Sequence, residues 1–391
     1  MSFRNRLSLL MVCMTAGWTA LAGVAKGAEL LLVPSITLKE EHNDNIFLTA
    51  QNATSDFITT IVPGVRGRAR TERFDGDLTV GFNYLDYLRH NLLDGLDFFG
   101  RNSLAYRVTP RLSVSAGGGY VRNSRPDQLS ATGIALNAGS DRYNAQGGAN
   151  LAVDELTNTS LTYGYDRQKF DNALQLPTTT HSVTLALDHD LDKVLPRTRS
   201  GVTFLYSNDD VVSSQVDNYA ASLVMSYTPR ELWKMSGSVG GRFTHSTFES
   251  SGHTFRTDDT GLIGSLSLGY ADDRNDGTLS FTRDLATASG GSSVTERTSL
   301  NLSLGRRLTE ELRGEVASSF AYNRTRQNQF SAVEINEKTL TARGSLRYTM
   351  TRYLDAEALY QYTHVDSGGE GGAAVQNLVM LRVNLSYEMG R

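Results

Sequence analysis

The sequence has little of several features that would mark a protein class at once. Of its 391 residues, one is cysteine, seven are proline and two are tryptophan, and the formal net charge is −4. Scarce proline argues against a low-complexity disordered chain, and the balanced charge offers no basic excess for nucleic acid. Mean hydropathy is −0.31. A multi-span helical membrane protein, which needs several apolar runs of about 20 residues, is therefore excluded.

The one cysteine, Cys13, lies in a segment with the features of a secretory signal. Two arginines precede an apolar stretch at residues 7–21, and small residues follow it. We expect residues 1–25 to be a signal peptide, cleaved after Ala22 or Ala25. The bulky valine before Cys13 argues against lipidation. Cleavage would leave a chain with no disulfide, no thiolate metal ligand and no cysteine nucleophile.

After this segment, the recurrent pattern is a two-residue alternation of apolar and polar side chains. It is clearest in residues 74–84, 262–270, 312–322 and 378–388. Successive side chains of a strand point to opposite faces, so each segment predicts a strand with one apolar and one polar face. The predicted strands span residues 34–48, 56–70, 73–89, 96–108, 112–123, 141–154, 158–170, 180–190, 199–208, 217–228, 232–247, 260–271, 277–285, 294–307, 311–326, 335–349, 353–364 and 376–389.

The connections between these strands alternate in kind. One set is short and polar, as in Thr109-Pro110-Arg111-Leu112 and Thr228-Pro229-Arg230. The other set is longer and rich in Gly, Ser, Asn and Asp, at residues 124–140, 171–179, 209–216, 248–258, 286–293, 327–334 and 365–375. Short turns on one rim and long loops on the other are typical of an outer-membrane barrel.

An apolar strand face must be hidden, and lipid can cover it only if the sheet has no open edge. We therefore predict an all-β fold, a single transmembrane antiparallel β-barrel of about 16–18 strands with short periplasmic turns and longer extracellular loops. The barrel would occupy residues 26–391 as one domain, although the length alone suggests two or three.

Tyrosines gather near the predicted strand ends. They are Tyr84, Tyr87, Tyr106, Tyr120, Tyr227, Tyr270, Tyr348, Tyr353, Tyr360, Tyr362 and Tyr387. This placement predicts an interfacial aromatic girdle. The alternative is the ordinary preference of tyrosine for strands.

The polar face carries charges of both signs that we expect to line the lumen. These candidates are Arg66, Arg68, Arg70, Asp75, Asp77, Arg101, Arg107, Lys234, Arg242, Arg297, Arg313, Glu315, Arg343, Arg347, Asp355, Glu357 and Arg382. They could guide an anionic or hydroxyl-rich solute, or form salt-bridge ladders that stiffen the wall. In an open pore they would set its selectivity.

No catalytic, cofactor or metal site is predicted. The sequence has no G-x-S-x-G and no H-E-x-x-H motif. In Asp188-His189-Asp190, neighbours in a strand face opposite ways, so the three side chains cannot converge on one site. The pairs Asp209-Asp210, Asp258-Asp259 and Asp272-Asp273 lack EF-hand spacing and are typical of solvated turns.

Residues 34–48 and 56–65 resemble the opening of a known family. The residues that carry the likeness are Glu41, Asn43, Asp44 and Asn45, followed by Pro63-Gly64 in the next strand. They are similar to the outer-membrane β-barrel family found with exosortase and exopolysaccharide gene clusters, called β-barrel porin 2. The resemblance implies a Gram-negative outer-membrane barrel serving surface polysaccharide export, and it brings no catalytic residues.

The functional expectation is an outer-membrane channel that acts as a conduit for exopolysaccharide export. Its partners would be outer-membrane lipid, the polysaccharide and a periplasmic export machinery, with no cofactor and no nucleic acid. One alternative is a general diffusion porin for small solutes. The other is a non-conducting structural or adhesive barrel, with loops 124–140 and 248–258 as its binding surface.

Overall fold

The computed structural model describes residues 29–390 except 131, 132, 137, 174, 213, 251, 288–293, 333 and 369–371. The expected signal peptide and Cys13 lie outside the described residues. No described helix is long and apolar enough to cross a membrane. The strands are β1 (Glu29–Asn43), β2 (Asp56–Arg70), β3 (Phe74–Tyr87), β4 (Gly95–Arg107), β5 (Leu112–Asn123), β6 (Ser140–Ala152), β7 (Thr157–Phe170), β8 (Thr178–Asp190), β9 (Thr198–Val211), β10 (Ser214–Arg230), β11 (Trp233–Ser250), β12 (His253–Ala271), β13 (Asn275–Thr287), β14 (Val294–Arg307), β15 (Leu312–Thr325), β16 (Ile335–Thr349), β17 (Leu354–Asp366), β18 (Ala373–Ser386) and the short β19 (Met389–Gly390).

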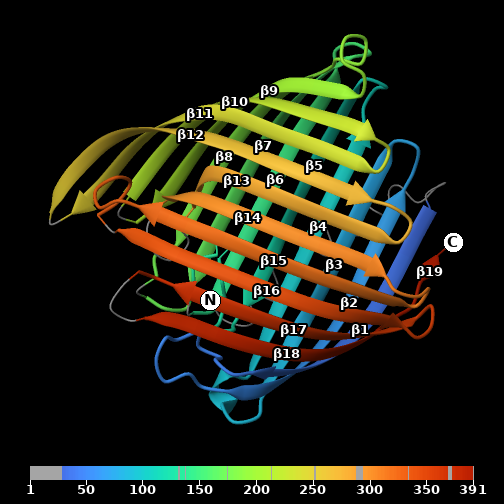
Figure 1. Cartoon of the computed structure of the whole chain (residues 1–391), viewed down its shortest axis with the longest axis vertical. Coiled ribbons are helices and arrows are strands. Elements are labelled where there is room, and N and C mark those ends of the chain that lie inside the picture. Colours follow the sequence, from blue (N-terminus) through green and yellow to red (C-terminus); the bar gives the residue numbers. More distant parts are fainter. Residues whose placement is uncertain are drawn as a thin grey trace.

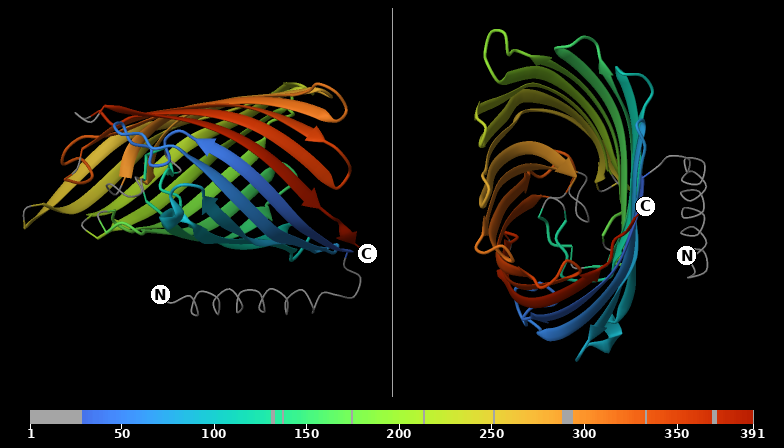
Figure 2. Two further views of the ribbon diagram at one scale, coloured as in Figure 1. Left: turned by 90° about the horizontal axis from the view of Figure 1, so that it is seen from below. Right: turned by 90° about the vertical axis from the view of Figure 1, so that its right-hand side faces the viewer.

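The first eighteen strands form one closed antiparallel barrel (Figures 1 and 2). Each strand pairs with the next along the chain, and β1 pairs with both β2 and β18. Leu38 is opposite Ile61 on one side and Val383 on the other. The even strand count places Glu29 and β19 at the rim of short turns, and the predicted fold class is confirmed.

The outer face of the barrel is an apolar belt. Leu262, Leu381 and Val239 are 75%, 61% and 64% exposed, although side chains of this kind are normally buried in a water-soluble fold. The lumen-facing neighbours of Leu381 are Met380 and Arg382. An exposed belt of this extent on a closed barrel is suited to lipid, because closure of the sheet removes the open strand edges that lipid could not satisfy.

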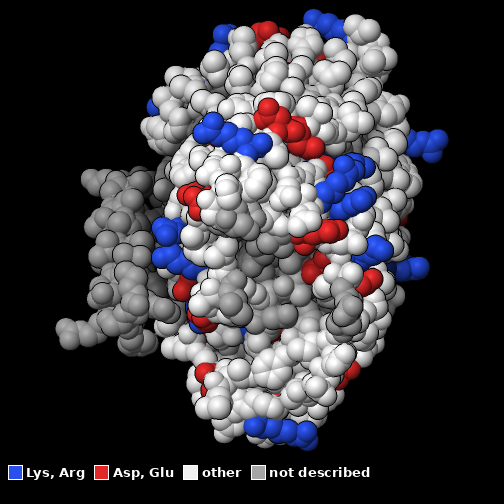
Figure 3. All heavy atoms as spheres, turned by 90° about the vertical axis from the view of Figure 1, so that its left-hand side faces the viewer, with Lys and Arg blue, Asp and Glu red and all other residues white. Residues whose placement is uncertain are grey.

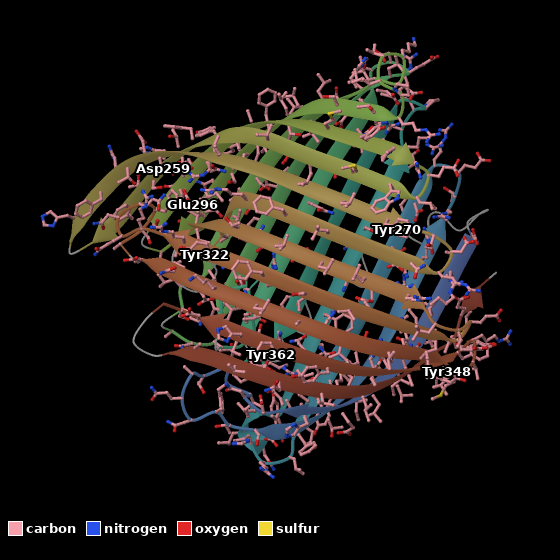
Figure 4. The ribbon with its side chains drawn as sticks, viewed as in Figure 1. Asp259, Tyr270, Glu296, Tyr322, Tyr348 and Tyr362 are labelled. Carbon is pink, nitrogen blue, oxygen red and sulfur yellow. The ribbon has the colours of Figure 1, made fainter. Side chains whose placement is uncertain are left out.

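Aromatic side chains lie at both ends of the belt. The pairs Tyr120–Tyr143 and Tyr206–Tyr219 lie at the loop end, with ring centroids 4.9 and 5.1 Å apart, and Trp233–Tyr270 and Tyr353–Tyr387 at the turn end, at 4.8 and 5.1 Å. Figure 4 shows the same separation for Tyr270 and Tyr348 at one end and Tyr322 and Tyr362 at the other. This arrangement fits two interfacial girdles.

Tyr87 was wrongly predicted to belong to the girdle. Its side chain is only 2% exposed and packs on the lumen side against Ile46, Ile58 and Leu85. The cause is parity: Tyr84 and Tyr87 are an odd number of residues apart in β3, so they must face opposite sides. Tyr84 remains on the outer face.

The short turns repeat one local device. The hydroxyl oxygens of Thr109, Thr309 and Thr351 each accept a hydrogen bond from the backbone N–H three residues later, at 3.0, 3.0 and 3.1 Å. A threonine side chain that satisfies a backbone donor favours a tight turn over a continued strand. This is the physical basis of the Thr-x-x-Leu turns in the sequence.

Two predicted long loops are strands instead. Residues 209–216 and 248–258 contain the ends of β9 and β10, and of β11 and β12, joined by short turns. The β11–β12 pairing continues to Ser250 and His253, whereas β12 pairs with β13 only from Gly264 to Ala271. Residues 253–263 of β12 therefore extend beyond the ring, on the left of Figure 1. Most side chains of residues 253–259 are polar on both faces of the strand, as at Asp258 and Asp259, so no two-residue alternation marks this part as a strand in the sequence.

Candidate pore and its constriction

The strand register places all seventeen predicted lumen residues on the face opposite the apolar belt. Most of them form cross-strand ion pairs. These are Arg66–Asp77 at 2.7 Å, Arg68–Asp75 at 3.2 Å, Arg70–Asp75 at 2.8 Å, Arg343–Glu315 at 3.0 Å, Arg347–Asp355 at 3.1 Å and Arg382–Glu357, while Arg297 pairs with Asp284 at 2.7 Å and Arg313 with Asp276 at 2.5 Å. In the described part of the chain, Arg101, Arg107 and Lys234 have no carboxylate partner.

The charges are unevenly distributed around the lumen. They concentrate on β1–β4 and β13–β18, whereas the middle of the opposite wall carries mainly small neutral side chains. On β10 the lumen positions include Ala220 and Ser222, and on β11 they include Ser236 and Ser238. Figure 3, which faces the loop end, shows both signs of charge distributed around it. The interior is therefore a polar surface with one charged and one hydroxyl-bearing side.

The connection between β5 and β6, described at residues 124–130, 133–136, 138 and 139, folds into the barrel instead of outward, and we call these residues the strap (Figure 2, right). It is itself a small hairpin in which Leu129 and Ala135 form a β-bridge. The amide of Gln128 donates hydrogen bonds to the carbonyl oxygens of Asn123, Arg125 and Ala138, at 2.6–3.0 Å. These hydrogen bonds fix the shape of the strap independently of its contacts with the barrel wall.

Arg125 anchors the strap to β1. Its guanidinium lies 2.5 Å from the Glu41 carboxylate and 2.8 Å from that of Asp127. Asp127 also accepts hydrogen bonds from the amides of Asn43, at 2.8 Å, and Gln376, at 3.0 Å. Charge-assisted hydrogen bonds of this kind are about twice as strong as neutral ones. The cluster joins the strap to β1 and β18 on the lumen side.

The strap's electrostatics favour the ionised form of both partners. Burial alone would raise the pKa of the Asp127 carboxyl, but the Arg125 charge and the hydrogen bonds from Arg125 and Gln376 outweigh burial and lower it. Burial likewise works to lower the pKa of Arg125, yet Asp127 and Glu41 raise it well above its ordinary value. The anchor is therefore a charged pair at neutral pH.

The far end of the strap reaches β16. The backbone N–H of Ala135 donates to the Glu337 carboxylate at 3.0 Å, and the hydroxyl of Thr339 donates to the carbonyl of Gly133 at 2.7 Å. Leu129 and Ala135 pack against a buried apolar cluster of Leu48, Val365 and Ala374. The strap thus connects β5 and β6 with β1, β16 and β18, and narrows the lumen at the loop end.

A second segment covers the inner face of β10 and β11. Phe330, in the connection between β15 and β16, is fully buried against Val216 and Val294. The hydroxyl of Ser214 donates to the Phe330 carbonyl at 2.9 Å. Below it, the Arg242 guanidinium lies 2.8 Å from Asp259 and 2.5 Å from Glu296, and Figure 4 labels both carboxylates.

Sequence reasoning missed both inward segments. Residues 124–140 and 327–334 were expected to be long extracellular loops, but Arg125 in the first and Phe330 in the second contact the lumen side of the wall. Residues 248–258, expected together with 124–140 as an external binding surface, lie mainly in β11 and β12 instead. A signal for the strap was present, because Leu129, Ile134 and Leu136 are unusually apolar for a solvated loop.

The Asp188-His189-Asp190 triplet does not converge. The His189 ring lies on the outer face, with Nδ1 2.9 Å from the Thr157 hydroxyl, whereas Asp190 faces the lumen and pairs with Arg199 at 3.4 Å. Among the residues with a described position, no group of three His, Cys, Asp or Glu side chains could hold a metal ion.

Fold and lumen together define a porin-like β-barrel. Among solved structures, Acinetobacter baumannii OccAB4 is similar with a TM-score of 0.50, at 9% identity over 93% of this chain and 98% of that one. Pseudomonas aeruginosa OccK2 (OpdF) has a TM-score of 0.50 at 12% identity, covering 92% and 98%. A BenF-like porin from Pseudomonas fluorescens Pf-5 has a TM-score of 0.47 at 10% identity, covering 94% and 100%.

At these identities the similarity shows the fold, which fits an outer-membrane location. No protein-family model matches the sequence, and no curated protein matches it. The resemblance to the exosortase-associated β-barrel porin 2 family is therefore supported only for the barrel it implies.

Proposed function

We propose that the protein is a passive channel for small hydrophilic solutes in a Gram-negative outer membrane. The strap is the observation that carries this proposal. An eighteen-stranded barrel is wide enough for an aqueous lumen, and a hairpin held across it by Arg125, Glu41 and Asp127 limits the size of what passes. Lumen charges paired across neighbouring strands would then influence which solutes enter.

This conclusion replaces export of a polysaccharide as the expected role. The fold comparisons give export no support, and a polymer needs a continuous wide path that the strap obstructs. The small-solute alternative requires no periplasmic export machinery. We propose that the seventeen charged residues of the inner face line the aqueous path and contact the solutes that pass.

Liposome swelling tests the size limit directly. Vesicles containing the purified barrel should swell quickly in small neutral solutes and slowly or not at all in oligosaccharides. A variant in which the strap is replaced by a short Gly-Ser turn should admit the larger solutes. A barrel that passes long oligosaccharides as readily as small solutes would contradict the proposed constriction.

A further inference from the structure

The inner wall of β13–β17 contains a concave patch that the ion-pair ladder does not fill. Its cavity has a volume of about 300 Å³. The polar side chains used in the argument below are Ser280, Asn301, Ser319, Thr341, Arg343 and Gln361. A cavity of this volume lies at the lower end of small-molecule sites and suits a single sugar ring better than a chain.

The patch lies immediately beyond the strap, toward the turn end. Thr339 hydrogen-bonds the strap at Gly133, and Thr341 is the next lumen-facing residue of β16. Likewise, a Cβ added to Gly133 would lie 3.1 Å from the Ala321 Cβ, and Ser319 is the next lumen-facing residue of β15. A solute that passes the strap on this side therefore reaches the patch next.

Several polar groups of the patch are available to a solute. In the part of the chain that the structure describes, the side chains of Ser280, Asn301, Ser319 and Thr341 make no hydrogen bond to protein. By contrast, the hydroxyls of Ser238 and Ser265, on the adjoining strands β11 and β12, bond each other at 2.8 Å. Hydroxyls both donate and accept, and the asparagine amide does both at separate atoms, so together they complement the hydroxyl groups of a solute.

The patch carries no net charge. Its one cation, Arg343, lies 3.0 Å from the Glu315 carboxylate, which neutralises it. No carboxylate or aromatic ring is among the residues that line the cavity. A charged solute would have no unpaired counter-charge here, whereas a neutral hydroxylated one could replace wall-bound water group by group.

We propose that this patch is a solute-binding subsite for neutral polyhydroxylated molecules of about one sugar ring, such as a hexose or a hexitol. The inference rests on the proposed channel function and specifies its substrate class. The binding is weak, because the hydroxyls are exposed to lumen water and no ring stacks on the sugar. Weak binding is what a conduit requires, since a tightly held solute would not leave.

The test combines equilibrium binding with electrical recording on the full barrel, using glucose as the probe. Saturation-transfer NMR on the detergent-purified protein measures binding, and the glucose dependence of ion-current noise in a planar bilayer measures occupancy during conduction. The pocket variant is Asn301→Leu with Thr341→Val. The matched control is Asn144→Leu with Thr203→Val, at lumen positions on β6 and β9. Heat-modifiable migration on gels confirms that each variant folds.

We expect the pocket variant to weaken glucose binding by at least about ten-fold, since two hydrogen-bonding groups are lost, and the control variant to change it by less than about two-fold. Gluconate and glucosamine, which add a negative or a positive charge, should bind no more tightly than glucose. Stronger binding of gluconate, or equal losses in both variants, would overturn the subsite.

The two measurements separate failure of the subsite from failure of the channel. A barrel that conducts ions but neither binds glucose nor shows glucose-dependent noise would refute the subsite and leave the channel intact. A barrel that binds glucose through Asn301 and Thr341 but carries no current would refute the channel and leave the subsite intact. Loss of both signals in a folded parent barrel would overturn both.

Discussion

Replacing Arg125 by alanine removes the cation at the centre of the strap's anchor. Without its guanidinium, the Glu41 and Asp127 carboxylates face each other with side chains only 8% and 6% exposed. Two buried carboxylates that have lost their shared cation repel each other, so water must enter or the strap must move away. We expect the strap to leave the wall in this variant.

The expected magnitude follows from the burial of the pair. Removing one partner of a buried ion pair costs about 3–5 kcal/mol, and because the Arg125 side chain is 20% exposed we take about 3 kcal/mol. Since about 1.4 kcal/mol is ten-fold in an equilibrium constant, the ratio of docked to undocked strap should fall about 100-fold. The substitution leaves the backbone hydrogen bonds between the strands unchanged, so the lost free energy is that of docking the strap against the wall.

Single-channel recording in a planar bilayer measures this change. Arg125→Ala should give a larger mean conductance and more current fluctuation than the parent, with unchanged heat-modifiable migration. Arg142→Ala is the matched control, because Arg142 is an arginine of the lumen wall whose pair with Asp166 is 2.8 Å long but 44% and 32% exposed. Exposed pairs contribute about 0–1 kcal/mol. A conductance of Arg125→Ala equal to that of the parent, or an equal rise in Arg142→Ala, would refute the reasoning.

Three further predictions concern acid, the buried tyrosine and the lipid face. Because the pKa of Asp127 is lowered in the folded protein, ionised Asp127 stabilises the docked strap above the ordinary carboxyl pKa of about 3.9, and this stabilisation is lost as pH falls through the lowered value. Conductance recorded from pH 8 to 3 should therefore stay constant until strongly acidic pH. A step in conductance between pH 6 and 8 would contradict this. Tyr87→Ala should destabilise the barrel in urea by about 3–5 kcal/mol because Tyr87 is fully packed, whereas Tyr106→Ala on the outer face should cost clearly less; equal costs would argue against the inward position. Leu381→Arg should cost about 2–4 kcal/mol in lipid, and Ser222→Arg in the lumen should cost much less; reversed costs would mean that the belt and the lumen are misassigned.

Much of the barrel could be predicted from the sequence because lipid imposes a simple rule. Most outward positions in the belt are apolar, with Asn102 on β4 among the exceptions, so the two-residue alternation in segments such as 378–388 predicts both the strand and the direction of each side chain. The same parity places Arg66, Asp77 and Arg382 toward the lumen. It fails beyond the belt, where residues 253–259 of β12 are mostly polar on both faces and lose the alternation.

The strap could not be predicted because its contacts join distant parts of the chain. Arg125 and Glu41 are 84 positions apart, and Ala135 and Glu337 are 202 positions apart. Which ion pairs form in the lumen depends on the strand register, for example Arg347 opposite Glu357 but bonded to the neighbouring Asp355. Parity gives the face of a residue, whereas the register and the path of a loop depend on the assembled barrel.

Recording from the unmodified barrel in a planar bilayer with potassium chloride on both sides tests the central claim most directly. A strap-narrowed aqueous channel predicts discrete current steps with a linear dependence on voltage near zero potential. A correctly folded barrel that inserts into the bilayer and produces no current above that of the bare membrane would contradict the account.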